Sequence, residues 1–144
     1  MAPGKEIIRQ AEEVVGLVEQ LCRLIKLKRT ELAGELGLSR AELDLLWVAG
    51  EQAEGISVRE AAEVLGVRPQ GLSTLAVQLE RKGLLVRGRD PQDGRTRRLL
   101  PSDKGRSLLS RAREVREAWA QAVLSAVPQP AVARLVLQRL ISAL

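Results

Sequence analysis

Residues 57–106 constrain the fold more than any other stretch of this 144-residue sequence. Ser57 can cap the start of a helix, and Glu60 completes the capping-box pattern three positions later. Gly66 suits the left-handed conformation that ends a helix, and Pro69 suits the first turn of the next one. Two helices joined by a short turn containing glycine are typical of a helix-turn-helix, whose second helix enters the major groove of DNA.

A β-hairpin is predicted to follow these two helices. Residues 84–87 form one predicted strand, residues 96–100 form the returning strand, and turn residues fill 90–94 between them. An arginine at the tip of such a hairpin suits the narrow minor groove, because negative potential is concentrated there. Asp93 lies close enough in sequence to orient the side chain of Arg95. The hairpin arginines predicted to project from it are Arg87, Arg89, Arg95, Arg97 and Arg98. An ordinary solvated face is the alternative interpretation, but the position directly after a helix-turn-helix favours DNA binding.

Three motifs of this stretch are shared with a known family. They are Leu79-Glu80-Arg81-Lys82-Gly83-Leu84-Leu85, Asp93-Gly94-Arg95, and Leu99-Leu100-Pro101-Ser102-Asp103-Lys104-Gly105. In combination they resemble the MarR family of bacterial transcription regulators, of the multiple antibiotic resistance regulator type. The resemblance implies a dimeric winged-helix protein that binds a palindromic operator. It also implies that a small ligand or an oxidant often releases the protein from DNA.

The second helix departs from the family's pattern on its outward face. The family often has serine, threonine, arginine and aspartate where this chain has Arg68, Gly71, Thr74 and Val77. Arginine is a poorer N-cap than serine, and Gly71 weakens a helix by about 1 kcal/mol relative to alanine. We therefore expect a small base-reading face, which consists of Gln70, Ser73, Thr74, Val77 and Gln78.

The basic excess of the chain lies in the same stretch. The formal net charge is +5, and residues 68–106 hold ten Lys or Arg against four Asp or Glu. This concentration is the electrostatic footprint of a phosphate-binding surface. The predicted DNA-binding residues are Arg68, Gln70, Ser73, Thr74, Gln78, Arg87, Arg89, Asp93, Arg95, Arg97, Lys104 and Arg106.

Apolar helices are predicted on both sides of this DNA-reading unit. Residues 5–28, 102–126 and 131–144 have apolar stripes that are wider or longer than a winged helix needs. Burial in a subunit interface is the simplest explanation, and burial in a monomer core is harder to satisfy with so short a chain. The predicted fold is mainly α with a small β-hairpin wing. Its regions are an N-terminal dimerisation helix region (1–36), a winged helix-turn-helix (37–101) and C-terminal dimerisation helices (102–144).

Local signals give the order of the remaining elements. Residues 29–36 are expected to be either a short helix or a bent continuation of the first helix, closed at Gly37. Ser39 and Glu42 form a second capping box, and Ser102 is expected to cap the long helix after the hairpin. Ile56 is expected to be a one-residue strand that pairs with the wing.

The sequence contains no residue set for catalysis or metal binding. It has no His and one Cys, which excludes a Cys/His zinc site within one chain, and it has no P-loop or dinucleotide-binding motif. We therefore expect a protein that is not an enzyme and has no cofactor. Since no long apolar run or signal peptide is visible, we also expect a cytoplasmic location and no membrane segment.

Cys22 and the two tryptophans have both structural and functional interpretations. Some members of the family sense hydroperoxides with a cysteine in the first helix, where tyrosines help to activate the thiol, and this chain has no tyrosine. We favour a small buried apolar residue at Cys22. In the family a ligand pocket lies between the dimerisation helices and the winged helix. Trp47, Trp119 and arginines are candidates to line it, although tryptophans at helical spacing are more often plain core.

These features together predict a homodimeric, sequence-specific regulator of transcription that binds double-stranded DNA. Repression is the expected mode, with a small-molecule effector of unknown identity, and the two half-sites are expected about 10 bp apart. The alternative is a winged-helix interaction module or a non-specific DNA-binding scaffold without its own operator. The short polar face of the second helix favours that alternative, whereas the concentrated charge favours DNA in either case.

Overall fold

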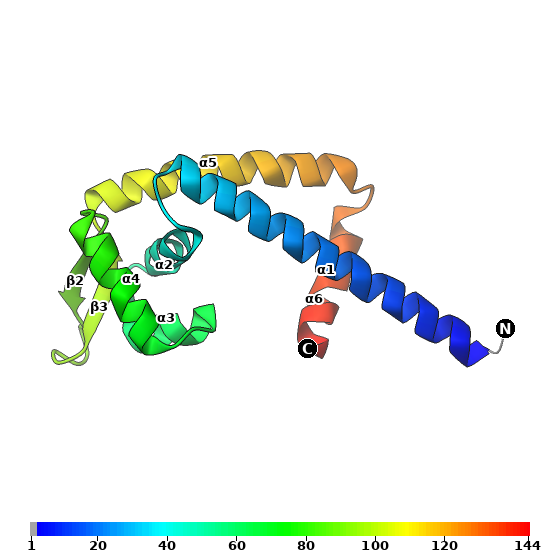
Figure 1. Cartoon of the computed structure of the whole chain (residues 1–144), viewed down its shortest axis with the longest axis horizontal. Coiled ribbons are helices and arrows are strands. Elements are labelled where there is room, and N and C mark those ends of the chain that lie inside the picture. The colour runs from blue at the N-terminus through cyan, green and yellow to red at the C-terminus, as the bar shows by residue number, and fades with distance from the viewer. Residues whose placement is uncertain (1–2) are drawn as a thin grey trace.

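The computed structural model describes residues 3–144, so the first two residues of the predicted N-terminal region lie outside it. The elements are α1 (Pro3–Glu35), α2 (Arg40–Gly50), β1 (Ile56–Ser57), α3 (Val58–Leu65), α4 (Pro69–Arg81), β2 (Leu85–Arg89), β3 (Arg97–Pro101), α5 (Asp103–Ala126) and α6 (Pro130–Ala143). The predicted mainly α fold with a hairpin wing is confirmed. Figure 1 shows α2, α3, α4 and the sheet gathered at one end of the molecule, from which α1 and α5 extend.

The first helix is one continuous element. It runs through Arg29 to Glu35, so the interpretation of residues 29–36 as a separate short helix is wrong. Gly37 then takes a left-handed φ of 73°, which turns the chain toward α2. Leu32 and Ala33 in the last turns of α1 are buried, and these residues fix the helix to the winged unit.

Three serines begin helices as their sequence patterns predict. The Ser39 and Ser57 hydroxyls accept hydrogen bonds from the N–H groups of Glu42 and Glu60, and the two carboxylates accept hydrogen bonds from the N–H groups of the same serines. Ser102 accepts from the Gly105 N–H at 3.0 Å and begins α5. Each cap satisfies backbone donors that have no partner within the helix.

The sheet has three antiparallel strands in the order β1-β3-β2. Ile56 pairs with Leu99, so the predicted pairing of Ile56 with the wing is confirmed, although the strand has two residues and not one. The hairpin pairs Leu85 with Pro101 and Arg89 with Arg97. Each of its two strands therefore begins and ends slightly later in the sequence than predicted.

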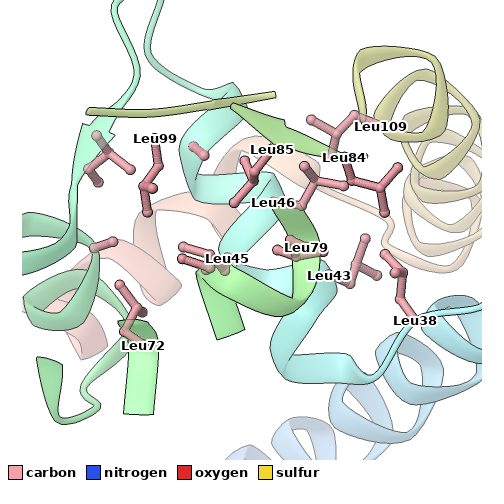
Figure 2. Packing of buried hydrophobic residues seen from close by; sticks show 14 of the residues in the cluster. Leu38, Leu43, Leu45, Leu46, Leu72, Leu79, Leu84, Leu85, Leu99 and Leu109 are labelled. Atoms are coloured by element: carbon pink, nitrogen blue, oxygen red, sulfur yellow. The ribbon is translucent and has the colours of Figure 1, made fainter. Parts of the chain in front are cut away.

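The core lies within the winged unit. Figure 2 shows Leu43, Leu45 and Leu46 of α2 surrounded by leucines of α4, the sheet and α5. Among these neighbours Leu79, Leu99 and Leu109 are fully buried. This packing holds α4 and the wing in a fixed relation to the ends of α1 and α5, because a close-packed interior tolerates little displacement.

Apolar side chains outside this core remain uncovered in the single chain. Those more than a third exposed include Ile7, Ile8, Val14, Val15, Leu17, Leu21, Leu24, Ile25 and Leu27 of α1, Val123 and Leu124 of α5, and Val132, Leu135, Val136, Leu137 and Ile141 of α6. So large an exposed apolar surface is unusual for a monomer and marks a surface that contacts another molecule.

Within residues 3–144, no single helix is both long and apolar enough to cross a membrane. The successive helices α5 and α6 meet the length and composition criteria only when taken together, and a bend of 108° separates them.

Candidate nucleic-acid interface

The turn between α3 and α4 positions the second helix of the helix-turn-helix. Gly66 has a φ of 64° and a ψ of 33°, and the Val67 N–H donates to the Ala62 carbonyl at 3.0 Å. α4 then begins at Pro69, while Arg68 at the N-cap makes no side-chain capping bond. Both features follow from the sequence, because glycine accepts the left-handed conformation and arginine lacks a short acceptor side chain.

The outward face of α4 presents the residues that the sequence predicts. Leu72, Ala76 and Leu79 of α4 are buried, and this burial directs the opposite face to solvent. The predicted contact residues on that face are exposed at Arg68, Gln70, Thr74 and Gln78, and half-buried at Ser73. Arg81 is also exposed at the end of the same face. Arg81 is absent from the predicted DNA-binding residues, although its spacing of three residues from Gln78 signals the shared face.

Two aspartates organise the turn at the tip of the wing. Asp90 Oδ1 accepts hydrogen bonds from the N–H groups of Gln92 at 2.8 Å and Asp93 at 3.2 Å. These two bonds, and to a smaller extent a hydrogen bond from Arg98, hold the pKa of the Asp90 carboxyl below its ordinary value. Asp93 Oδ1 accepts from the backbone N–H of Arg95 at 3.0 Å, and Oδ2 accepts from the Thr96 hydroxyl at 2.9 Å. Asp93 therefore holds the backbone of the turn, and within residues 3–144 no bond joins its carboxylate to the Arg95 guanidinium, in contrast to the predicted hold on that side chain.

Three arginines of the wing have exposed side chains that are available for contact with DNA. Arg89, Arg95 and Arg97 are exposed, and among the described residues 3–144 none of their guanidinium groups has an ion pair or a side-chain hydrogen bond. Arg95 follows Gly94 in the turn at the tip of the hairpin. These three side chains can therefore contact phosphate or a groove without first breaking an internal bond.

Arg98 has a different role from the one predicted. Its side chain is 14% exposed and does not project from the hairpin. Its Nε and Nη2 donate to the Gly55 carbonyl at 3.2 and 3.0 Å, and Nη1 lies 2.9 Å from Asp90 Oδ2. Nη2 also lies 3.4 Å from Glu60 Oε2 at the start of α3. Arg98 thus joins the wing turn to the beginning of the helix-turn-helix.

Three further candidate DNA-binding residues already have partners within the chain. Arg87 Nε is 2.5 Å from Glu80 Oε1 of α4. Lys104 Nζ donates to the Lys82 carbonyl at 3.2 Å. Arg106 donates to the Pro101 carbonyl at 2.8 Å and pairs with Asp103. These bonds hold the three cations close to the wing. The carboxylates partly offset the charges of Arg87 and Arg106, whereas Lys104, bonded to a carbonyl, keeps its full charge for phosphate.

A buried carboxylate connects the end of α4 to the start of α2. Glu42 Oε2 accepts from the Ser39 N–H at 2.8 Å and lies 2.9 Å from Lys82 Nζ. Lys82 Nζ also approaches the Gly37 carbonyl at 3.4 Å. Burial raises the pKa of the Glu42 carboxyl, but the bonds from Lys82 and Ser39 outweigh burial, and the pKa lies below its ordinary value. The sequence predicted Glu42 only as part of a capping box.

A cavity of about 430 Å³ lies between α1, α2, α5 and the end of α3. Trp47, Trp119 and arginines line it, as expected for a family ligand pocket. The guanidinium of Arg116 lies 5.1 Å from the centre of the Trp47 ring and that of Arg113 lies 5.8 Å away, within the range of cation–π attraction. The indole N–H of Trp47 donates to Glu51 at 2.9 Å. The full lining is Ile25, Arg29, Leu32, Leu43, Trp47, Val48, Glu51, Leu65, Arg116 and Trp119.

Cys22 is exposed in the single chain, and its predicted burial as a small apolar residue, on a stripe expected to lie in a subunit interface, stays a prediction. The apolar stripe of α1 to which it belongs lies outside the core of this chain. Within residues 3–144, no group of three or more His, Cys, Asp or Glu side chains is placed to hold a metal ion.

Comparison with known proteins identifies the architecture. A model described as MarR family matches residues 36–96. The structure of CouR from Rhodococcus jostii RHA1 bound to p-coumaroyl-CoA is similar with a TM-score of 0.80 and 26% identity, and the match covers 92% of each chain. The transcriptional regulator BldR from Sulfolobus solfataricus gives a TM-score of 0.75 and 25% identity over 95% of this chain and 98% of its own. MepR from S. aureus in complex with DNA shares the fold, with a TM-score of 0.72 and 20% identity over 90% and 96%. No curated protein matches the sequence.

Proposed function

Because the chain belongs to the MarR family of transcription regulators, we propose that it binds a palindromic operator as a homodimer and represses transcription until a small molecule releases it. The observation that carries the proposal is the free cationic wing beside the polar outward face of α4. Since the comparisons show DNA-binding regulators and the site residues suit DNA, we further propose that the protein has no catalytic activity and acts in the cytoplasm.

The homodimer is proposed from the uncovered apolar surface. Most of the exposed apolar residues lie on α1, the end of α5 and α6, away from α4 and the wing. A second copy of the same chain would bury these faces and place a second α4 on the same side of DNA. The predicted regions 1–36 and 102–144 act in this proposal as the dimerisation helices, and 37–101 acts as the DNA-binding domain.

The contact with DNA is proposed to use two grooves. α4 lies in the major groove with Gln70, Thr74 and Gln78 toward base edges, and the wing places Arg95 in the minor groove. Arg89 and Arg97, on the two strands that lead to the tip of the wing, contact phosphates. Arg68 also faces the backbone at the start of α4. Asp93 supports Arg95 indirectly, because it fixes the backbone of the turn.

The effector is proposed to bind the cavity between α1, α2 and α5. CouR binds p-coumaroyl-CoA, which shows that a protein of similar structure accommodates an acyl-CoA ligand. Here the tryptophan rings suit a flat apolar group, and Arg116 suits a negative charge. A ligand in this cavity would contact α1 and α5 as well as α2, so it can favour one relative placement of the two winged units over another.

Selection of bound duplexes from a random pool tests the proposed function. An inverted repeat with half-sites about 10 bp apart is expected for a homodimer that inserts two recognition helices. Recovery of duplexes without a shared sequence would instead support the alternative of a non-specific DNA-binding scaffold. The intact chain is used, because the dimerisation helices are part of the proposal.

The effector site has a built-in spectroscopic reporter. The chain has two tryptophans and no tyrosine, and both tryptophans line the cavity. Binding of p-coumaroyl-CoA or free p-coumarate is therefore expected to change the intrinsic fluorescence, and a bound compound that also releases the selected duplex is an effector. Release of DNA without any change in fluorescence would place the effector elsewhere.

A further inference from the structure

An apolar side chain lies in the middle of the otherwise polar outward face of α4. Val77 is 37% exposed and does not belong to the buried set of Leu72, Ala76 and Leu79 on the opposite face. It lies three residues after Thr74 and four residues before Arg81, so the three share one side of the helix. Figure 1 shows that α4 lies on the outside of the winged unit, beside the wing.

Thr74 extends this apolar spot. Its hydroxyl donates to the Gln70 carbonyl one turn earlier, at 3.3 Å. With the hydroxyl engaged by the helix backbone, the methyl group is the part of the side chain left for an outside contact. Position 71 is glycine, and a Cβ added there would meet nothing within 4 Å. No side chain at position 71 therefore stands between a DNA duplex and the methyl groups of Thr74 and Val77.

The major groove has one apolar feature that such a spot can recognise. Base edges there present hydrogen-bond donors and acceptors, and thymine alone among the four standard bases adds a C5-methyl group. Phosphates attract cations and hydrogen-bond donors, and neither a valine nor a threonine methyl group is one. An apolar group at the centre of a base-reading face therefore gains most free energy against a thymine methyl group.

We propose that Val77, together with the methyl group of Thr74, contacts the C5-methyl group of one thymine in each operator half-site and so specifies that base pair. The inference rests on the proposed DNA-binding function and deepens it. It assigns base specificity to a residue whose chemistry differs from the hydrogen-bonding residues Gln70 and Gln78 on the same face.

Replacement of thymine by deoxyuridine tests the contact atom by atom, because uracil keeps every hydrogen-bonding group and lacks only the methyl group. Each thymine of the selected duplex is replaced in turn, first in one half-site and then at the symmetric positions of both. The dissociation constant is measured for each duplex. At one position, replacement in a single half-site is expected to weaken wild-type binding about fourfold, because the burial of one methyl-sized group is lost. Replacement in both half-sites is expected to weaken it about fifteenfold.

Protein variants show which side chain makes the contact. Val77→Ala is expected to bind the thymine and the uracil duplexes within twofold of each other at that position. Val64→Ala is the matched control, because Val64 is an exposed valine on α3 and off the outward face of α4, and it should keep the full fourfold penalty. Thermal unfolding verifies that Val77→Ala stays folded, which is expected for an exposed position.

Failure of this inference is separable from failure of the proposed function. If the selection recovers no preferred sequence, operator recognition fails, and the thymine contact fails with it. If an operator is recovered but no uracil position changes the dissociation constant, only the thymine contact is overturned. Retention of the full uracil penalty by Val77→Ala likewise overturns the role of Val77 and leaves the operator function intact.

Discussion

Replacement of Glu42 by glutamine is expected to lower the free energy of unfolding by roughly 1–2 kcal/mol at pH 7. Glu42 is 5% exposed, and its Oε2 accepts from the Ser39 N–H and from Lys82 Nζ. Glutamine can keep the bond from Ser39, but a neutral acceptor is worth about 1 kcal/mol less than a charged one. Lys82 is 42% exposed, so solvent screening limits the lost ion pair to roughly 0.2–1 kcal/mol.

The pH dependence of this loss follows from the lowered pKa of Glu42. A carboxyl whose pKa is lower in the folded state stabilises that state at pH values above its unfolded pKa. This stabilisation disappears as the pH falls through the folded pKa, which lies below the ordinary value of 4.5. The difference between wild type and Glu42→Gln should therefore be full at pH 7 and shrink progressively below pH 4.5.

Urea unfolding of the intact chain at several pH values measures this difference, and Glu60→Gln is the matched control. Glu60 occupies the same capping-box position of α3, but its side chain is 49% exposed and its nearest cation, Arg98, is 3.4 Å away. Since solvent weakens both its capping bond and its ion pair, its replacement should cost less than about 0.5 kcal/mol. An equal loss in both variants, or a Glu42→Gln loss that stays constant into the acid range, would refute the assignment of Glu42 as a buried charged connection between α2 and α4.

Three further predictions concern DNA binding and the helices. Arg95→Ala is expected to weaken binding to the selected operator by about 1–3 kcal/mol, measured by titration. Its thermal stability should not change, since the side chain is exposed. Operator affinity equal to that of wild type would exclude the wing from the interface. Truncation after Pro128 removes α6 and is expected to abolish the dimer and tight DNA binding together, which sedimentation and titration detect; a truncated dimer would exclude α6 from the interface. Gly71→Ala is expected to stabilise the chain by up to about 1 kcal/mol in urea unfolding, because the added Cβ meets nothing within 4 Å; a destabilised variant would contradict the open space at this position.

Local signals predicted the boundaries of most elements. Ser39, Ser57 and Ser102 begin helices because a cap needs only residues within one turn, and Gly37 and Gly66 end them for the same reason. The turn residues at 90–94 between two short strand patterns predicted the wing, and local signals predicted that Ile56 pairs with it. The candidate DNA-binding residues on α4 and the tip arginines are placed as expected, and their contact with DNA stays a prediction.

Roles that depend on distant segments were beyond sequence reasoning. Arg98 lies in a run of hairpin arginines, but the loop ending at Gly55, which no local pattern connects to it, supplies its main acceptor. Asp93 was assigned to a side chain, whereas the turn geometry uses both of its oxygens.

The mass of the protein–DNA complex, measured by sedimentation on the selected duplex and on a duplex with one half-site, tests the dimeric recognition of DNA most directly. We expect two chains on the full duplex, with far weaker binding when one half-site is scrambled, because both winged units of a dimer must engage. One chain bound per half-site, with the same affinity whether or not the second half-site is present, would contradict the homodimer and the palindromic operator together.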